Sequence, residues 1–292
     1  MIWRGVEGRG YPGEGALPTF IIIGAQKCGT TGLHVYLSKH PEVSMSRPKE
    51  LDFFIKRRTW GKGVDWYRTR FDASSPIRRE ASPNYTSYPH RRGVANRMHS
   101  VVPDVKLIYM VRDPIDRIAS QWIHNYAQRR ERGTLADTIN HPRSTYISRS
   151  RYAYQLERFL KYYPREQILV LDQRDLRDNR HQLLRQVFEF IGADPDFTHE
   201  SFSEVHHASS QKRRASKTAA SLARLSRKYP RWLPNEAVWL GLDSRIPGRQ
   251  PIPRQDVTGA LTRESIELLR ADAEELRRIT GRDFAHWSIW EA

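Results

Sequence analysis

A glycine-containing loop between an apolar run and a helical pattern is the first place where this sequence could do chemistry. Residues 24–31 read Gly-Ala-Gln-Lys-Cys-Gly-Thr-Thr and directly follow the apolar run at 19–23. A turn from a buried strand into a helix points backbone N–H groups and the positive end of the helix dipole at one place, which favours an anion. The hydroxyls of Thr30 and Thr31 can donate to that anion, and Lys27 adds a positive charge. The loop therefore predicts a site for a phosphate-like group, with a ligand-free glycine turn as the alternative.

This loop differs from the phosphate loop of nucleoside triphosphatases. That motif places a lysine directly after its second glycine, followed by a serine or threonine that binds magnesium. Here Thr30 follows Gly29, and Lys27 lies inside the loop. A lysine in this place can reach the bridging oxygen of a phosphosulfate. Sulfuryl transfer involves less charge than γ-phosphoryl transfer, so we expect no metal ion to be needed.

A second anion site is predicted around Arg112 and Ser120. Arg112 ends the apolar run at 105–111, and Asp113-Pro114 is typical of a helix start, with an N-cap aspartate and a proline at the first helical position. Ser120 then lies about two turns into that helix, on a flank. Arginine can bind a phosphate through two hydrogen bonds, and serine adds a donor. The alternatives are a structural ion pair for Arg112 and a solvent-facing Ser120.

Strand-like and helical patterns alternate along the chain. Short apolar runs at residues 19–23, 105–111 and 168–171 read as strands, a further short strand is expected at 42–45, and apolar residues at helical spacing lie between them. A last helical pattern ends at Gly281, where a left-handed cap fits. This alternation favours an α/β fold with a mostly parallel sheet flanked by helices, and ligands of such sheets bind beyond the carboxyl ends of the strands. We expect one domain over residues 1–292, with the basic segment at about 206–255 as an elaboration or a lid.

Four segments together resemble the sulfotransferases that use 3′-phosphoadenosine-5′-phosphosulfate (PAPS), most closely the branch with heparan-sulfate-type and many bacterial members. They are residues 24–31, Lys49-Glu50-Leu51-Asp52-Phe53-Phe54, Ser82-Pro83-Asn84-Tyr85, and Arg112-Asp113-Pro114 with Ser120. The resemblance implies a sulfotransferase fold like that of the P-loop nucleotidases, with PAPS as donor and adenosine 3′,5′-bisphosphate (PAP) as product. It implies a phosphosulfate site at Lys27, Cys28, Gly29, Thr30 and Thr31, a 3′-phosphate site at Arg112 and Ser120, and further donor contacts from Lys212 and Arg213.

The same resemblance implies that Glu50 is the catalytic base. Its position after the second apolar run places it at the sheet edge that carries the loop, and a carboxylate there can take the acceptor's proton. Lys27 and Lys49 can offset negative charge on the leaving phosphate. The alternative is a surface carboxylate paired with Lys49 or Arg47, with His124 as the next candidate base. Cys28 lies near a helix N-terminus, which can lower a thiol pKa, but we assign it no catalytic role.

Two departures from the family pattern concern the acceptor. Ala81 stands where the family often has a lysine before its Ser/Thr-Pro pair, and the chain has Asp52 and Ile55 where the heparan-type branch has histidine and aspartate. We therefore expect an acceptor that differs from the polysaccharide of that branch. Its class stays open between a small molecule, a lipid and a carbohydrate, and the sulfated atom between oxygen and nitrogen.

Composition bounds the remaining possibilities. The 292 residues carry a formal net charge of +16, which calls for an anionic partner. One cysteine excludes an internal disulfide, and no apolar run approaches the roughly 20 residues of a membrane span. The first residues also lack the apolar segment of a secretory signal. We expect a cytoplasmic protein with no membrane span, and the sequence favours no particular oligomeric state.

Two other functions fit parts of the sequence. A metal-dependent small-molecule kinase with a degenerate phosphate loop could present Asp113 to magnesium. A nucleic-acid-binding protein could use the basic segment at 206–255, with Trp232 and Trp239 as stacking platforms. The second alternative leaves the anion-binding loop unexplained, so we expect no nucleic-acid partner.

Overall fold

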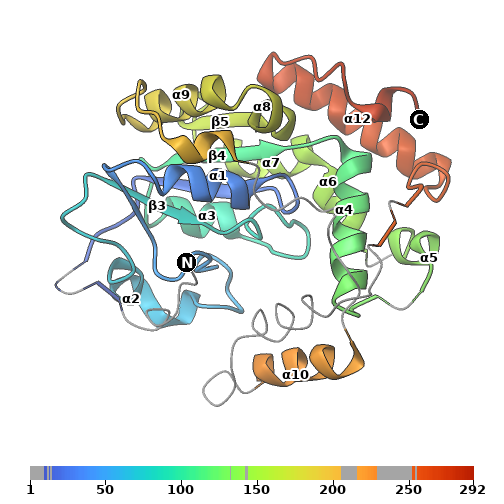
Figure 1. Ribbon diagram of the computed structural model, residues 1–292, viewed down its shortest axis with the longest axis horizontal. Coiled ribbons are helices and arrows are strands. Elements are labelled where there is room, and N and C mark those ends of the chain that lie inside the picture. Colours follow the sequence, from blue (N-terminus) through green and yellow to red (C-terminus); the bar gives the residue numbers. More distant parts are fainter. Residues whose placement is uncertain are drawn as a thin grey trace.

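The central sheet contains five strands within the described parts of the chain, and every neighbouring pair is parallel. The computed structural model describes residues 10–11, 13, 15–131, 133–141, 144–204, 216–228, 252–253 and 255–292. The strands are β1 (Phe20–Gly24), β2 (Val43–Met45), β3 (Ile77–Ala81), β4 (Lys106–Val111) and β5 (Ile168–Asp172), in the order β2-β3-β1-β4-β5. The predicted α/β fold with a parallel sheet is confirmed (Figure 1).

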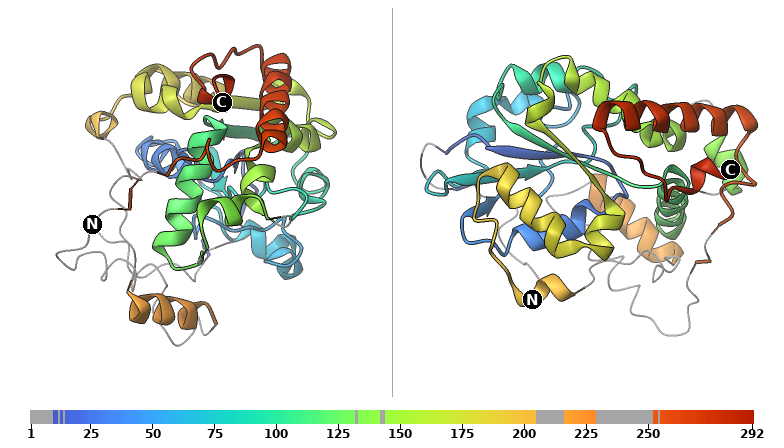
Figure 2. Two further views of the ribbon diagram at one scale, coloured as in Figure 1. Left: turned by 90° about the vertical axis from the view of Figure 1, so that its right-hand side faces the viewer. Right: turned by 90° about the horizontal axis from the view of Figure 1, so that it is seen from above.

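Helices cover both faces of the sheet. The helices of the described residues are α1 (Thr30–Leu37), α2 (Gly63–Arg68), α3 (Val94–His99), α4 (Pro114–Ala127), α5 (Leu135–Ile139), α6 (Thr145–Ser150), α7 (Tyr152–Leu160), α8 (Gln173–Asp178), α9 (Arg180–Ile191), α10 (Lys217–Lys228) and α12 (Arg263–Thr280). Short 3₁₀ helices are η1 (Trp60–Lys62), η2 (Arg165–Gln167), η3 (Glu200–Ser203) and η5 (Ser288–Trp290). The view from above in Figure 2 shows α1, α8 and α9 on one face and α3, α7 and α12 on the other.

The strand order has a switch point at the carboxyl end of β1. From β1 the chain first builds β2 and β3 on one side of it, and then crosses to β4 and β5 on the other side. Connections leave the sheet in opposite directions at such a switch point, which is where ligands of parallel sheets bind. The helix α4 stands across this edge in Figure 1. Both predicted anion sites therefore begin at the same edge of the sheet.

The strand β3 was missed by the sequence analysis. Its residues Ile77-Arg78-Arg79-Glu80-Ala81 contain three charged side chains, whereas a strand in a covered parallel sheet normally reads as an apolar run. Arg79 and Glu80 are nevertheless fully buried, one residue apart in a strand, and so on opposite faces of the sheet. Arg79 contacts His34 of α1, while Glu80 accepts hydrogen bonds from buried hydroxyls on the other face. Specific polar partners thus replace the apolar pattern on which the prediction depended.

The C-terminal segment is hydrogen-bonded to the carboxyl edge of the sheet, next to β4 and β5. As predicted, α12 ends at Gly281, whose φ of 69° is left-handed. The indole of Trp287 then donates to Asp172 at the end of β5 over 2.9 Å, and the amide of Ser288 donates to Asp113 at the start of α4. The ends of β5 and of the β4–α4 loop are therefore held together by this segment.

The predicted elaboration at 206–255 lies mostly outside the described residues. Its described part contains α10, which lies away from the sheet in both Figure 1 and Figure 2. Lys212 and Arg213, the predicted donor contacts from this segment, are not among the described residues.

Candidate active site

The loop after β1 turns through two left-handed residues before α1 begins. Gly29 is the N-cap of α1 with φ 85°, a conformation that glycine adopts without steric cost. Lys27 also has a positive φ, 76°, which costs a non-glycine residue on the order of 1–3 kcal/mol. There is no room for a side chain at position 24. A Cβ on Gly24 would overlap the Thr86 hydroxyl and lie 2.9 Å from the Tyr109 ring. The glycines therefore permit a tight turn that leads into the N-terminus of α1, as an anion site requires.

The structure brings the predicted base segment against this loop. The ammonium of Lys49 donates to the Thr31 hydroxyl over 3.2 Å and lies 3.5 Å from Glu50 Oε1. Thr31 is exposed in the first turn of α1, whereas Thr30 is buried. Three residues that the sequence assigned to the site therefore form one continuous contact, and the alternative pairing of Glu50 with Lys49 is part of it.

Glu50 is partly exposed to solvent. Its side chain keeps 45% of its surface exposed, yet burial of the remainder raises the carboxyl pKa, and the Lys49 charge partly offsets that rise. A raised pKa makes a carboxylate a stronger base at the same pH. The environment of Glu50 is therefore suited to proton transfer and remains accessible to an incoming acceptor.

Arg112 and Ser120 retain hydrogen-bonding capacity that the described protein does not use. Arg112 forms an ion pair of 3.0 Å with Asp116, which agrees with the alternative that this arginine has a structural role. Its Nε, however, is buried without a partner in the described part of the chain. Ser120 is 4% exposed rather than solvent-facing, and its hydroxyl bonds to no other described residue. Asp113 caps α4 as predicted, accepting from the amides of Ile115 and Asp116. Buried unpaired donors are costly, so an anion such as a phosphate fits here.

The thiol of Cys28 is enclosed by the protein core. It is fully buried, 3.5 Å from the Tyr152 hydroxyl, and burial raises its pKa to about 11. The expectation that a helix N-terminus could lower this pKa is wrong for Cys28, because desolvation dominates over the helix dipole. Only its backbone can line the predicted donor loop.

Two arginines that the sequence analysis did not select support the loop from the opposite side. Arg117 of α4 is fully buried and donates to the carbonyl of Gln26 over 3.4 Å and to Ser150 Oγ over 2.6 Å. Arg149 of α6 donates to the Gln26 side chain, and its Nε has no partner among the described residues. Burial, together with the charge of Arg117, lowers the pKa of Arg149 to about 10. An arginine on an amphipathic helix reads as a surface residue, so only the fold reveals this role.

His124, the alternative base, lies on α4 one turn beyond Ser120. Glu50 lies next to Lys49, which bonds to the donor loop at Thr31, so Glu50 stays the first candidate base and His124 the second.

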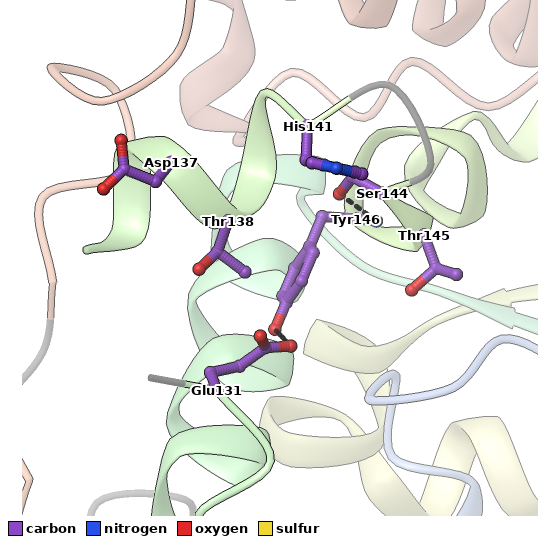
Figure 3. A pocket seen from close by; sticks show the side chains of 7 residues that line it. All are labelled: Glu131, Asp137, Thr138, His141, Ser144, Thr145 and Tyr146. Carbon is purple, nitrogen blue, oxygen red and sulfur yellow. Dashed lines mark hydrogen bonds between the residues drawn. The ribbon is translucent and has the colours of Figure 1, made fainter. Parts of the chain in front are cut away.

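A cavity of about 400 Å³ lies beyond α4, between α5 and α6 (Figure 3). Figure 3 shows the Tyr146 hydroxyl pointing at Glu131, to which it donates over 3.0 Å, with Asp137 on the far wall. None of the predicted donor residues lines this cavity. Two carboxylates in its wall make it unsuited to an anionic nucleotide.

The described residues contain neither a metal-binding cluster of side chains nor a membrane-spanning helix. No group of three or more histidine, cysteine, aspartate or glutamate side chains there could hold a metal ion. No helix within the same residues is both long and apolar enough to cross a membrane.

Comparison with known proteins gives one consistent family. The family described as "Sulfotransferase domain" matches residues 17–232. The human bifunctional heparan sulfate N-deacetylase/N-sulfotransferase 3 is 30% identical over 211 residues, which are 65% of this chain and 23% of that protein. The human enzyme 2 of the same name is 32% identical over 207 residues, 61% of this chain and 22% of that protein. The chain thus spans under a quarter of the length of these curated relatives.

A solved structure shares the fold. The crystal structure of a sulfotransferase from Alicyclobacillus acidocaldarius is 23% identical to this chain. The superposition covers 93% of this chain and 99% of the other, with a TM-score of 0.66.

Proposed function

This chain belongs to the sulfotransferase domain family, and from that premise we propose that it moves a sulfuryl group from PAPS to a hydroxyl or amine of its acceptor. The family assignment replaces the two alternatives, a kinase and a nucleic-acid-binding protein. The observation that carries the proposal is the contact of Lys49 with both Thr31 and Glu50, because it joins an anion-binding loop to a base.

The loop after β1 suits the phosphosulfate end of the donor. Its backbone amides, the N-terminus of α1 and the Thr31 hydroxyl are donors that anionic oxygens require. Lys27 supplies a charge inside the loop. Arg117 and Arg149 hold the loop at Gln26 and add positive potential behind it. A dianionic group is therefore favoured there without a metal ion.

The unused donors of Arg112 and Ser120 suit the 3′-phosphate. The Nε of Arg112, buried without a partner among the described residues, and the hydroxyl of Ser120 both come from the β4–α4 unit. A phosphate would give the arginine a charge-assisted bond, and the serine could add a second donor. This second anchor would distinguish PAPS from nucleotides without a 3′-phosphate.

The chemistry then follows from Glu50 and the two lysines. Glu50 takes the proton that the acceptor oxygen or nitrogen loses as that atom bonds to sulfur. The bond from sulfur to the bridging oxygen breaks at the same centre, and the electron pair stays on the phosphate. Lys27 and Lys49 stabilise the negative charge that develops there. Lys49 also keeps Glu50 next to the loop.

The acceptor class is proposed as a small molecule, a lipid or a carbohydrate. The names of the two human relatives state that they N-sulfate heparan sulfate, so amino sugars and sugar hydroxyls come first in a screen. Ala81 and Asp52, which depart from the family pattern, support an acceptor different from theirs.

Nucleotide binding tests this proposal before any acceptor is known. PAP should raise the melting temperature in the absence of magnesium, because a ligand of the native state stabilises it. AMP, which lacks the 3′-phosphate, is the matched control and should shift the melting temperature far less. Equal shifts with PAP and AMP would remove the assignment of Arg112 and Ser120, and no shift with PAP would contradict the donor.

A further inference from the structure

The carboxylate of Glu80 is fully buried on β3 and is surrounded by hydroxyl groups. Its Oε1 accepts from Ser82 Oγ over 2.7 Å and from the Tyr85 hydroxyl over 2.5 Å, and its Oε2 accepts from the Tyr67 hydroxyl. No cation lies within ion-pair distance of it among the described residues. Burying a carboxylate without a cation is costly, so three hydroxyl donors are the compensation.

Two of these hydroxyls also accept hydrogen bonds from backbone amides. Ser82 Oγ accepts from the amide of Asp52 over 2.9 Å, and the Tyr85 hydroxyl accepts from the amide of Phe54 over 3.4 Å. Each hydroxyl has one hydrogen, and here the carboxylate receives it. The hydroxyl oxygens are then left as acceptors for the two amides. The carboxylate, which can only accept, therefore fixes the direction in which the two hydroxyl hydrogens point.

The segment held in this way begins directly after Glu50. Asp52 has a left-handed φ of 51°, which a non-glycine residue keeps only if surrounding bonds hold it. Thr59 Oγ1 donates to the carbonyl of Leu51 over 2.7 Å, and Arg97 Nε to that of Phe54 over 2.8 Å. The backbone over 51–54 is therefore fixed at four points, and Glu80 controls two of them.

We propose that Glu80 is a positioning residue of the sulfotransferase: its carboxylate orients the Ser82 and Tyr85 hydroxyls, which hold the backbone at Asp52 and Phe54 and so set the direction of Glu50. This role rests on the proposed function of Glu50 as the base. Glu80 itself touches neither donor nor acceptor.

Protonation of Glu80 would interrupt this arrangement. Burial raises the pKa of Glu80 to about 7, against hydrogen bonds from Tyr67, Tyr85 and Ser82 that lower it and the charge of Asp52 that raises it further. A protonated carboxyl carries one hydrogen, and where that hydrogen lies on Oε1 it displaces the bond that Ser82 or Tyr85 donates there. A glutamine has the same effect where its NH₂ group takes the place of Oε1.

Glu80→Gln and Tyr67→Phe form a matched pair for the test. Both remove a hydrogen bond at the same carboxylate, but Tyr67→Phe leaves Ser82 and Tyr85 oriented and keeps the ring that stacks on Phe53 at 4.1 Å. At about pH 9, where the parent carboxyl is ionised, amide hydrogen exchange at Asp52 and Phe54 should speed up in Glu80→Gln and stay slow in Tyr67→Phe. Ser82→Ala, which removes the acceptor for Asp52 together with one donor to Glu80, should speed up exchange at Asp52 and serves if Glu80→Gln does not fold.

Turnover and donor binding complete the test. Glu80→Gln should lower turnover by on the order of 10²-fold, the cost of a small misplacement of a catalytic group, while PAP affinity stays that of the parent. Tyr67→Phe should turn over like the parent. If Glu80→Gln shows faster amide exchange but turns over like the parent, Glu80 has no positioning role. If exchange stays slow in both Glu80→Gln and Ser82→Ala, the hydroxyls that Glu80 orients do not hold the backbone amides. Failure of the proposed function is seen separately, as a parent that does not bind PAP.

Discussion

Lys49 donates a hydrogen bond of 3.2 Å to the hydroxyl of Thr31, which lies 18 residues earlier in the chain. The same ammonium group lies 3.5 Å from Glu50 Oε1. One lysine thus connects the first turn of α1, where anionic oxygens are expected, with the group that is expected to take a proton. The donor site and the base are parts of one contact network, so a change at Lys49 should affect both.

Lys49→Met tests this link through the pH profile. Burial raises the pKa of Glu50, and the positive charge of Lys49 lowers it. Removing the charge while keeping a long apolar side chain should raise the Glu50 pKa further. Because the base must be ionised, the acid limb of turnover should move to higher pH. Lys49→Arg, which keeps the charge, is the control. An unchanged acid limb in Lys49→Met would show that Glu50 does not control it.

Arg112→Ala should weaken PAP binding more than Ser120→Ala does. A charge-assisted contact is worth about 1.5–3 kcal/mol, against about 1 kcal/mol for a neutral hydroxyl bond. Titration calorimetry with PAP measures both losses. Asp116→Asn is the control, because it removes the 3.0 Å ion pair and leaves the arginine in place. If Arg112→Ala binds PAP like the parent, the 3′-phosphate lies elsewhere.

Glu50→Gln and Lys27→Ala should separate chemistry from binding. Glutamine keeps the shape of Glu50 but cannot accept the proton, so turnover should fall by roughly 10²–10⁴-fold with PAP affinity nearly intact. Lys27→Ala should lower both, because Lys27 contacts the donor before and during transfer. Single-turnover rates and PAP affinities of the two variants provide the measurement. Parental turnover in Glu50→Gln would make His124 the next residue to change, and the reverse pattern would exchange the two roles.

The free energy of unfolding should fall as pH rises from about 4.5 to about 7. Burial raises the pKa of Glu80 from its ordinary value of 4.5 to about 7, so within this window the folded state holds a proton that the unfolded state has lost. Stability falls with pH wherever the folded state binds more protons. Asp272, whose pKa burial raises from 3.8 to about 6, acts in the same direction over a lower window. Urea midpoints at several pH values should show a weaker slope in Glu80→Gln, and an identical slope would place the titration elsewhere.

Gly24→Ala should destabilise the fold at the start of the donor loop. The new Cβ would overlap the Thr86 hydroxyl and crowd the Tyr109 ring, so the backbone must move at a typical cost of about 1–3 kcal/mol. Denaturant unfolding measures this cost. Gly61→Ala is the matched control, since no atom lies within 4 Å of a Cβ built there. Equal stability of the two variants would contradict the tight turn after β1.

The sequence by itself determined the features whose causes are local. The glycine loop of residues 24–31, the Asp113-Pro114 helix start and the cap at Gly281 follow from backbone sterics and from hydrogen bonds between neighbouring residues. Four of the five strands were predicted, three of them because each is a short apolar run. The family resemblance rested on the same short segments, and the match over residues 17–232 confirmed it.

Only the tertiary structure decided which side chains meet. The charged strand β3 was missed, because the burial of Arg79 and Glu80 depends on polar partners such as His34 and Tyr67 that only the fold brings to them. Cys28 was expected beside the helix dipole, but packing turns its thiol to Tyr152. Lys49 and Thr31 come into contact because the sheet places β2 two strands from β1 and leads both following segments to one edge. Such contacts depend on strand order and side-chain direction, which spacing along a chain does not encode.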